Sequence, residues 1–373
     1  MAIRLTRVAA PVVALGLLVA ACSSDKPAAP APTDSAAFDQ LVAAAKAEGT
    51  VIVSGPRGLP DLQTVLTTEF TDKYGITVQY SGDGASAVLK KLEDVKAGDA
   101  YPYDVLVGGY DTLFANVGTQ LAALDDLLVL PEVKDTSKWE DNTIPWDDAA
   151  HKSIGFLSQS GQYFYLDTSK ASLADITSYR DLLKPEFKGQ ILLSGDPRED
   201  GTANAVMALF MQSKDLGADF VKQFLTEASP VIAASDDEVD ADIKNPTFTI
   251  CVCNNSQGTE LLQEHPNFAK LDPHKVKEGT STTSSFANLG VPWHVQHPNA
   301  AKLYANWILS KDAELAISKA TGLPSQRTDV AKDFIAAQSI PDPSWPSGSN
   351  ESALDEKQAA KDLAVQVLGK LDS

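Results

Sequence analysis

Short apolar runs alternate with segments of helical periodicity along most of the chain. Residues 50–54, 76–80 and 104–107 are apolar or alternate in polarity, and they predict buried strands. Residues 62–74 carry apolar side chains at helical spacing, and a further helix is expected to run up to Lys96. Each of these strands ends at a loop that contains glycine or precedes a turn. This alternation predicts an α/β lobe whose loops gather at one edge of a sheet.

A second series of the same kind occupies the middle of the chain. Residues 191–193 predict a buried strand, and we expect Thr202 to be the N-cap of the helix that follows. Residues 248–253 predict another strand, which ends in the polar residues 254–256. Open α/β sheets bind ligands beyond the carboxyl ends of their strands. We therefore expect a second lobe in which residues 194–202 form one side of a binding cleft, with an ordinary strand–helix connection as the alternative.

The amino terminus has the pattern of an export signal. Arg4 and Arg7 precede an apolar run, which is followed by small residues and Cys22. The five residues that end at Cys22 resemble a bacterial lipobox, which implies cleavage before this cysteine and attachment of diacylglycerol to its sulfur. We expect residues 1–21 to be a lipoprotein signal peptide. Residues 22–37 are rich in Pro, Ala and Ser and predict a flexible tether between the lipid and the folded body.

Composition excludes several classes of protein. The net charge of -19 argues against nucleic-acid binding, because that function needs a basic surface. The chain contains no G-x-S-x-G elbow, no H-E-x-x-H pair and no P-loop. We therefore expect a protein that is not an enzyme, with no catalytic residues, no cofactor and no metal site. Cys251 and Cys253 lie two residues apart, and a local disulfide or two buried thiols are both favoured over a metal site.

Several segments, in their order and spacing, resemble one known family. They are EDVKAG to YDVLVGG at 93–109, KPEFKGQILLSGDPREDGT at 184–202, HPNAAKLYANWILSKDAE at 297–314 and TGLPSQRTDV at 321–330. Together with the lipobox and tether, they resemble the extracellular solute-binding proteins of ABC importers with type 2 periplasmic-binding-protein topology. That group includes ferric-iron binders. The resemblance implies an α/β, two-lobed fold with a central ligand cleft and two crossing hinge strands.

The resemblance also implies an organisation of the chain and a function. Residues 38–153 and 286–373 are expected to form lobe 1, and residues 154–285 lobe 2. The crossing strands are expected near residues 154–165 and 280–291. A protein of this family captures a solute by hinge closure and delivers it to a membrane permease that works with an ATPase subunit. We expect a monomer, anchored through Cys22 on the extracytoplasmic side of the bacterial membrane.

Polar or glycine residues in the loops at the expected cleft are the candidate ligand contacts. Arg57 is suited to pairing with a carboxylate or phosphate, and residues 82–86 are suited to holding an anion with backbone N–H groups. The alternatives are a solvated arginine, turn glycines, a core role for Tyr110, and a surface pair between Arg198 and Glu199. The full candidate set is Arg57, Gly84, Ala85, Ser86, Gly109, Tyr110, Ser160, Asp196, Arg198, Thr202, Asn254, Asn255 and Ser256.

The sequence departs from the ferric binders at one position. Those proteins use adjacent tyrosines as ligands about where this chain has residues 253–256, and no Tyr-Tyr pair occurs in the sequence. Asparagine amides are poor ligands for ferric iron and good partners for a polar organic solute. We therefore expect a small polar solute, with anionic solutes favoured. The alternatives are a ferric-iron-binding protein and a ligand sensor that works with a membrane kinase.

Overall fold

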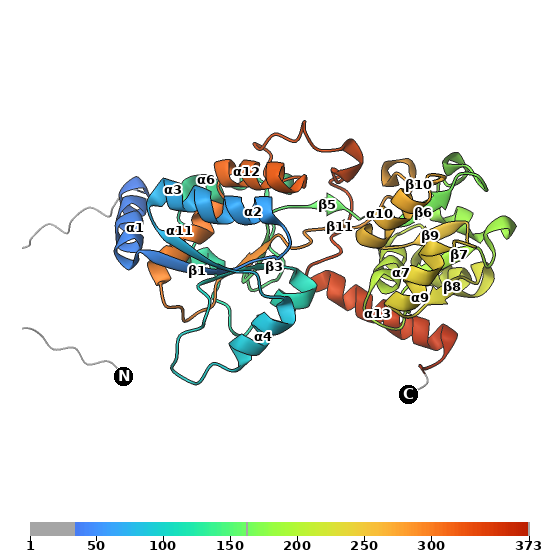
Figure 1. Ribbon diagram of the computed structural model, residues 1–373, viewed down its shortest axis with the longest axis horizontal. Coiled ribbons are helices and arrows are strands. Elements are labelled where there is room, and N and C mark those ends of the chain that lie inside the picture. The colour runs from blue at the N-terminus through green and yellow to red at the C-terminus, as the bar shows by residue number, and fades with distance from the viewer. Residues whose placement is uncertain (1–33, 162, 372–373) are drawn as a thin grey trace, which may run out of the picture.

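The computed structural model describes residues 34–161 and 163–371, which form two α/β lobes lying side by side (Figure 1). Each lobe is built on a five-stranded sheet with helices packed against it. The two-lobed α/β architecture expected from the sequence is therefore confirmed. The expected signal peptide, Cys22 and most of the tether lie outside the described residues. None of the described helices is both long and apolar enough to cross a membrane.

The sheet of lobe 1 has the strand order β2-β1-β3-β12-β4. The strands are β1 Thr50–Ser54, β2 Thr77–Ser81, β3 Val105–Gly108, β4 Ile154–Gly155 and β12 Asn288–Gly290. β1 is parallel to β2 and β3, whereas β12 is antiparallel to β3 and β4. The loops after β1, β2 and β3 therefore emerge at one edge of the sheet and face lobe 2, as the sequence predicts.

Helical segments cover both faces of this sheet. They are α1 Asp34–Glu48, α2 Pro60–Thr64, α3 Phe70–Tyr74, α4 Ala85–Glu93, α5 Ala115–Val117, α6 Pro131–Lys134, α11 Pro298–Ile308 and α12 Lys311–Thr321, with π-helical segments η1 Val65–Glu69 and η2 Tyr110–Phe114. The helix expected at 62–74 is a continuous run of α2, η1 and α3. α1 packs against α11, and it begins at Asp34. The last residues of the expected tether, 34–37, are therefore helical instead.

The sheet of lobe 2 has the order β10-β6-β9-β7-β8. Its strands are β6 Phe164–Asp167, β7 Ile191–Ser194, β8 Val231–Ala233, β9 Ile250–Val252 and β10 Phe268–Lys270. Its helices are α7 Thr202–Gln212, α8 Gly217–Gln223, π-helical η9 Phe224–Ala228, α9 Asp236–Lys244 and α10 Asn255–Glu264. β7 is parallel to β8 and β9. The carboxyl ends of these three strands therefore lie at one edge, beside the connection to lobe 1.

Short 3-10 turns complete the secondary structure. They are η3 Leu124–Asp126, η4 Thr136–Lys138, η5 Glu140–Asn142, η6 Leu173–Asp175, η7 Tyr179–Leu183, η8 Pro185–Phe187, η10 Pro273–Lys275 and η11 Ala337–Ser339. η7 begins with a capping box between Ser178 and Asp181. This turn places Tyr179 and Leu182 in the core of lobe 2.

Three chain passages connect the lobes. β5 Gln159–Ser160 and β11 Thr282–Thr283 pair antiparallel as a two-stranded ribbon, and they lie within the two crossings implied by the resemblance. The third passage runs beside β11. The Thr282 N–H donates to the carbonyl of Pro346 at 2.8 Å, and the Gly348 N–H donates to the carbonyl of Thr282 at 2.7 Å. This third passage leads directly into the last helix, α13 Glu351–Leu368.

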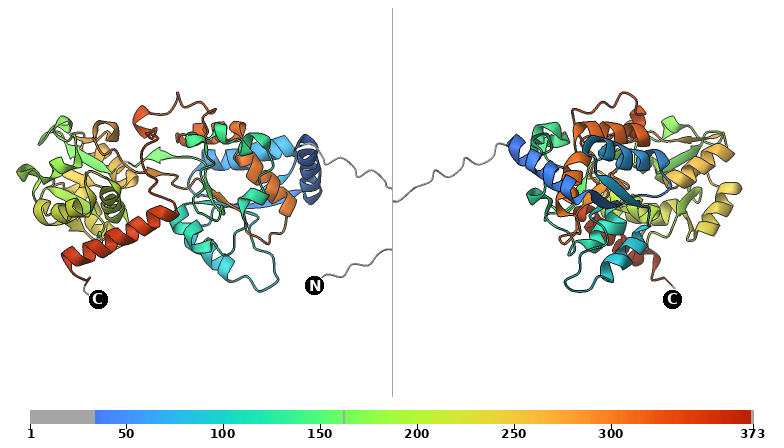
Figure 2. Two further views of the ribbon diagram at one scale, coloured as in Figure 1. Left: turned by 180° about the vertical axis from the view of Figure 1, so that it is seen from behind. Right: turned by 60° about the vertical axis from the view of Figure 1, so that its left-hand side comes forward.

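The position of α13 corrects the expected division of the chain. The sequence analysis assigned residues 286–373 to lobe 1, but α13 packs along α7 of lobe 2 (Figure 2). Ala360, Leu363 and Ala364 of α13 belong to the lobe 2 core. The apolar stripe of the helix was recognised in the sequence, but the stripe alone does not identify the surface that buries it.

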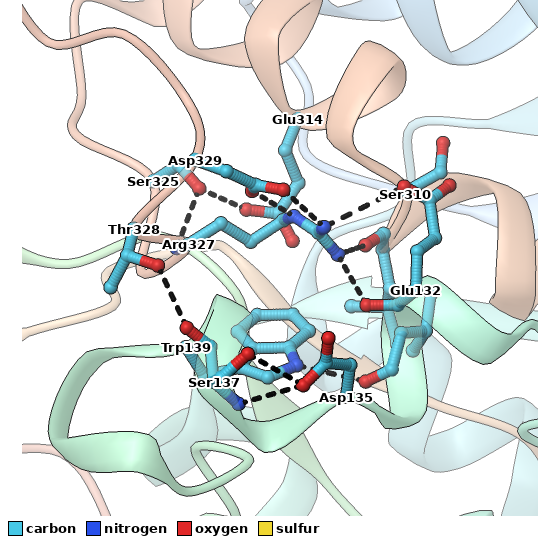
Figure 3. Close-up of polar contacts among 12 residues, drawn as sticks. Glu132, Asp135, Ser137, Trp139, Ser310, Glu314, Ser325, Arg327, Thr328 and Asp329 are labelled. Atoms are coloured by element: carbon cyan, nitrogen blue, oxygen red, sulfur yellow. Dashed lines mark hydrogen bonds and ion pairs between the residues drawn. The ribbon is translucent and has the colours of Figure 1, made fainter.

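The segment TGLPSQRTDV is held on lobe 1 by a buried arginine (Figure 3). Arg327 is fully buried; its Nε donates to Asp329 Oδ1 at 2.9 Å and its Nη1 donates to the carbonyl of Leu309 at 3.1 Å. Its guanidinium lies 5.3 Å from the ring centroid of Trp139, a cation–π distance. The polar residues of this segment therefore hold it against lobe 1.

Candidate functional site

A cavity of about 570 Å³ lies between the lobes, and we call it the interlobe cavity. Lobe 1 contributes the residues after β3, lobe 2 contributes the start of α7, and the crossing passages and α13 close one side. The residues that line it are Asp111, Thr112, Tyr163, Asp200, Gly201, Thr202, Ala205, Thr283, Gly348, Ser349, Leu354 and Lys357. Its position beyond the carboxyl ends of β3 and β7 is where open α/β sheets bind ligands.

The start of α7 presents backbone donors to this cavity. Thr202 was the predicted N-cap, but Gly201 is the N-cap, and no side chain in the described part of the chain caps the helix. Gly201 has φ 153°, a conformation that glycine adopts without strain. The first N–H groups of the eleven-residue helix therefore have no side-chain acceptor, and the positive end of its dipole lies beside Thr202 at the cavity wall.

The charged groups of the cavity are paired with α13. Lys357 forms an ion pair with Asp111, and Lys361 Nζ lies 2.8 Å from Asp200 Oδ1. Oδ1 of Asp111 is shielded from solvent and accepts no hydrogen bond from any described residue. An unfilled, shielded acceptor is costly, and a ligand that donates a hydrogen bond would remove that cost. The cavity therefore offers both donors, at α7, and an acceptor, at Asp111.

Asp196 and Arg198, which we expect to contact a solute, interact with each other in the structure. Arg198 Nε lies 2.9 Å from Asp196 Oδ1, and its Nη2 lies 2.6 Å from Oδ2. Arg198 Nη1 also donates to the carbonyl of Gly369, just after α13. The hydrogen bonds from Arg198 hold the pKa of Asp196 below its usual range. Of the three residues expected from this loop, only Thr202 lines the interlobe cavity.

Arg57 and the start of α4 lie together in lobe 1. Arg57 is exposed, and a Cβ placed on Gly84 would lie 3.9 Å from Arg57 Nη2. Gly84 is the N-cap of α4, so Ala85 and Ser86 form the first turn, whose N–H groups have no side-chain cap. None of these four residues lines the interlobe cavity. They lie on the rim of lobe 1, at the carboxyl ends of β1 and β2.

The neighbouring Asp83 already fills part of the expected anion site. Its Oδ2 accepts hydrogen bonds from Lys91 Nζ at 2.6 Å, Ser81 Oγ at 2.6 Å and Tyr103 Oη at 2.5 Å. These hydrogen bonds, that of Lys91 first, lower the pKa of Asp83 far below its ordinary value. The glycine loop therefore holds a carboxylate of its own chain, and only its α4 side is open to a ligand.

Tyr110 and Ser160 are turned away from the cavity. Tyr110 is 5% exposed and packs in the cluster that includes Leu113 and Phe114, and burial raises the pKa of its phenol. It is a core residue and not the stacking ring we expected. Ser160 is 1% exposed, and its Oγ donates to the carbonyl of Gln338 at 2.5 Å. Gly109, the N-cap of η2, approaches the backbone of Ser285 in the second crossing closely, since a Cβ there would meet its carbonyl oxygen at 3.1 Å.

The polar residues after β9 lie at the start of α10. Asn254 and Gln257 form a capping box: Asn254 Oδ1 accepts from the Gln257 N–H at 3.0 Å, and Gln257 Oε1 accepts from the Asn254 N–H at 3.1 Å. Gln257 Oε1 also accepts from Ser194 Oγ at 2.7 Å, which ties the loops after β7 and β9 together. Asn255 and Ser256 are exposed at this edge of lobe 2. Asn254 is therefore a capping residue, and its two neighbours face solvent.

The question of the two cysteines is answered by the structure. Cys251 and Cys253 are joined by a disulfide, with their Cα atoms 5.5 Å apart, and both are fully buried in lobe 2. Within residues 34–161 and 163–371, no group of three or more His, Cys, Asp or Glu side chains is placed to hold a metal ion.

The sequence analysis missed several residues of the interlobe cavity. Asp111 and Thr112 directly follow the predicted pair Gly109 and Tyr110, so the loop was correct but its contacting residues lie one or two positions later. Lys357 gave no signal, because a lysine on a terminal amphipathic helix is usually a solvated residue. Only the packing of α13 against α7 brings it to the cavity.

The fold and the interlobe cavity define a two-lobed receptor for small solutes. Residues 66–347, well over half of the chain, match the family model of the bacterial extracellular solute-binding proteins. The chain therefore belongs to this family, and it is a substrate-binding receptor of the ABC-importer type. No curated protein matches the chain.

Solved structures of periplasmic binding proteins share the fold at low sequence identity. Iron-bound HitA from Pseudomonas aeruginosa is 17% identical with a TM-score of 0.58, covering 85% of this chain and 99% of its own. FutA of Trichodesmium with iron and citrate is 16% identical with a TM-score of 0.62, covering 86% and 100%. PotD from Streptococcus pneumoniae with calcium and HEPES is 17% identical with a TM-score of 0.58, covering 86% and 99%. These likenesses establish the fold and leave the solute open.

Proposed function

We propose that this protein captures a small polar solute in the interlobe cavity and delivers it, chemically unchanged, to the permease of an ABC importer. A lipid on Cys22 would hold it at the extracytoplasmic face of the membrane. The observation that carries the proposal is a cavity lined by both lobes, with an uncapped helix start on one wall and the unfilled Oδ1 of Asp111 on the other.

Capture would proceed by hinge closure about the crossing passages. β5 and β11 are only two residues long each, and rotation there changes few packing contacts. A solute that contacts both Asp111 of lobe 1 and Thr202 of lobe 2 gains more contacts when the lobes approach. That differential affinity shifts the population toward the closed form.

The residues at the cavity favour a solute that carries an anionic group together with hydrogen-bond donors. The free N–H groups of α7 attract negative charge, and Arg57 with the start of α4 offers a second such place on the opposite rim. Asp111 Oδ1 needs a donor, which a hydroxyl or amine of the same solute supplies. Simple inorganic anions lack that donor, so we favour an organic solute.

Thermal unfolding with a panel of solutes tests this proposal. The panel contains phosphate esters, phosphonates, hydroxy acids, dicarboxylates, sugars and ferric iron. A solute at 100 times its dissociation constant adds about 2.7 kcal/mol to the free energy of unfolding. We expect the strongest response from an anionic organic solute. A response to iron alone would favour the ferric-binding alternative, and turnover of any solute would contradict the proposal.

Variants then locate the binding site of the best solute. Thr202→Val keeps the shape of the side chain, removes its hydroxyl, and is expected to weaken binding about five- to tenfold, the worth of one hydrogen bond. Thr226→Val is the matched control, because Thr226 is exposed in η9 of the same lobe and bonds only to the Lys222 carbonyl among the described residues. Equal affinities for both variants would place the solute elsewhere.

A further inference from the structure

A second cavity, which we call the hinge cavity, lies on the other face of the crossing ribbon. Its volume is about 220 Å³. Successive residues of a strand point to opposite faces, and in β11 Thr282 lines the hinge cavity while Thr283 lines the interlobe cavity. Its outer wall includes Trp146, which pairs with Ile154 along the edge of β4 away from β12. Ser349 borders both cavities, and apart from it their lining residues differ, so the hinge cavity lies on the other side of the crossing passages.

The charge of the hinge cavity is one-sided. Four of its lining residues are acidic, namely Glu140, Asp141, Asp147 and Asp342, and no Lys, Arg or His is found among its described lining residues. Glu140 is paired with Lys332 from outside the cavity. The other three carboxylates form no ion pair within the described part of the chain. A low-dielectric pocket lined by one sign of charge attracts a ligand of the opposite sign.

Asp147 gives this cavity a specific acceptor. The residue is 7% exposed, and its Oδ2 accepts hydrogen bonds from Ser153 Oγ at 2.6 Å and from Asn288 Nδ2 at 2.8 Å. Its Oδ1 accepts no hydrogen bond from the described residues. A buried carboxylate needs hydrogen-bond donors on both oxygens, and here the chain supplies them to Oδ2 alone. A ligand in the cavity would supply the donor that Oδ1 lacks.

Two tryptophans form the apolar part of the wall. Trp146 is stacked on His151 with ring centroids 4.3 Å apart, and Trp345 lies 4.6 Å from the ring of His274. Both indoles line the cavity. Indole is the best aromatic partner for an organic cation. The acidic side chains are also too dispersed to form a metal site in the described residues.

We propose that the hinge cavity binds a small organic cation, a primary amine whose ammonium group donates to Asp147 Oδ1 and whose carbon chain lies against Trp146 and Trp345. The volume leaves room for such a molecule, because on the same measure one water needs only about 10–15 Å³. The site is distinct from the solute site of the proposed function. Since Thr282 and Ser158 of the crossing strands form part of its wall, its occupant contacts the hinge itself.

Calorimetric titration of the purified protein with n-butylamine tests the proposal, with 1-butanol as the uncharged counterpart. The titration is carried out about two pH units above the pKa of about 7 that burial gives Asp147, so that its carboxyl group is ionised. We expect binding of the amine and none of the alcohol. Asp147→Asn is expected to weaken amine binding at least tenfold, and Trp345→Leu about fivefold. Asp355→Asn is the matched control, because Asp355 is exposed on α13 away from the cavity, and it should leave the affinity unchanged.

Further measurements distinguish amine binding in the hinge cavity from binding elsewhere and from metal binding. If Asp147→Asn fails to fold, as judged by circular dichroism, Asp342→Asn replaces it, since Asp342 lies on an exposed loop and is expected to weaken binding about threefold. Amine affinity that falls in Thr202→Val but not in the Asp147 and Asp342 variants would assign the amine to the interlobe cavity and overturn the proposal. Binding of Mg²⁺ or Ca²⁺ with no response to the amine would overturn it as well, and so would no binding at all.

Discussion

The surroundings of Asp147 raise the pKa of its carboxyl group. Burial raises its pKa to about 7 from the ordinary 3.8, and the nearby charges of Asp148 and Asp111 raise it further, while the hydrogen bonds from Ser153 and Asn288 oppose the shift. The folded state therefore keeps this proton to a higher pH than the unfolded chain does. Stability from this group is present below about pH 4 and is lost as the pH rises to about 7.

The variant Asp147→Asn makes this loss measurable. Its free energy of unfolding, relative to that of the wild type, is expected to increase between pH 4 and pH 7 by at most ~4 kcal/mol, at 1.36 kcal/mol for each unit of pKa. Urea unfolding at both pH values, without added amine, provides the measurement. Burial also raises the pKa of Glu314, but this residue is present in both proteins, so its contribution to the pH dependence cancels in the comparison. A relative stability that does not change with pH would contradict the assignment.

Arg327 is a fully buried cation, and its removal would leave its hydrogen-bond partners without a donor. Asp329 and the carbonyl of Leu309 would lose their donor, and the stacking on Trp139 would be lost. We expect Arg327→Met to lower the free energy of unfolding by roughly 3 kcal/mol, as measured by urea unfolding. Arg180→Met is the control, because Arg180 is exposed, and it should cost less than about 1 kcal/mol. Similar costs for the two variants would show that the buried arginine is not a structural anchor.

At the scale of elements, α13 connects the lobes in a way that its sequence does not reveal. Its body packs on α7, and its first turns contact lobe 1: Glu351 Oε2 accepts from the Ala149 N–H at 2.9 Å, and Lys357 pairs with Asp111. The helix therefore spans the hinge beside the interlobe cavity. Ion pairs of this kind, being partly exposed, contribute little to stability, so the apolar contacts with α7 fix its position.

Truncation of one α13 side chain tests this packing. Leu363 is 7% exposed within the lobe 2 core, and Leu363→Ala is expected to lower the free energy of unfolding by about 2–3 kcal/mol. Leu371 is 42% exposed beyond the helix end, and Leu371→Ala should change stability by less than about 0.5 kcal/mol. Urea unfolding compares the two. If Leu363→Ala were as mild as Leu371→Ala, α13 would not be part of the lobe 2 core.

At the scale of the whole molecule, three narrow passages and the first turns of α13 join the two lobes, while each lobe has its own buried core. Motion of one lobe against the other therefore disturbs few contacts, whereas motion within a lobe disturbs many. This division is the mechanical basis of the proposed capture. Net charge of -19 acts on solubility and does not determine the sign of the cavity.

Closure should be visible in solution scattering. Addition of the best solute from the thermal panel is expected to decrease the radius of gyration, because the lobes approach when both contact the solute. In Thr202→Val the same decrease should require about five to ten times more solute, in line with the lost hydrogen bond. An unchanged radius of gyration at saturation would rule out hinge closure as the mode of capture.

Much of the fold was predictable because its signals are local. The runs at 50–54, 191–193 and 248–253 each contain a strand, β1, β7 and the shorter β9, since an apolar run between turn residues has few other stable forms. The site was predicted less well. Asp196, Arg198 and Asn254 are polar residues in the correct loops, but each finds a partner within its own lobe. The sequence shows that these three residues are polar, but it does not show which groups they bond to.

The sequence by itself determined the strand–helix alternation, the two series of strands and the family to which the chain belongs, because hydrophobic periodicity and motif order are carried by neighbouring residues. The tertiary structure alone decided that α13 packs on lobe 2, that Lys357 reaches Asp111, and that acidic residues from two distant segments, 140–147 and 342, surround one cavity behind the hinge. Such contacts join residues far apart in the chain, so they depend on how the lobes pack and not on any local pattern.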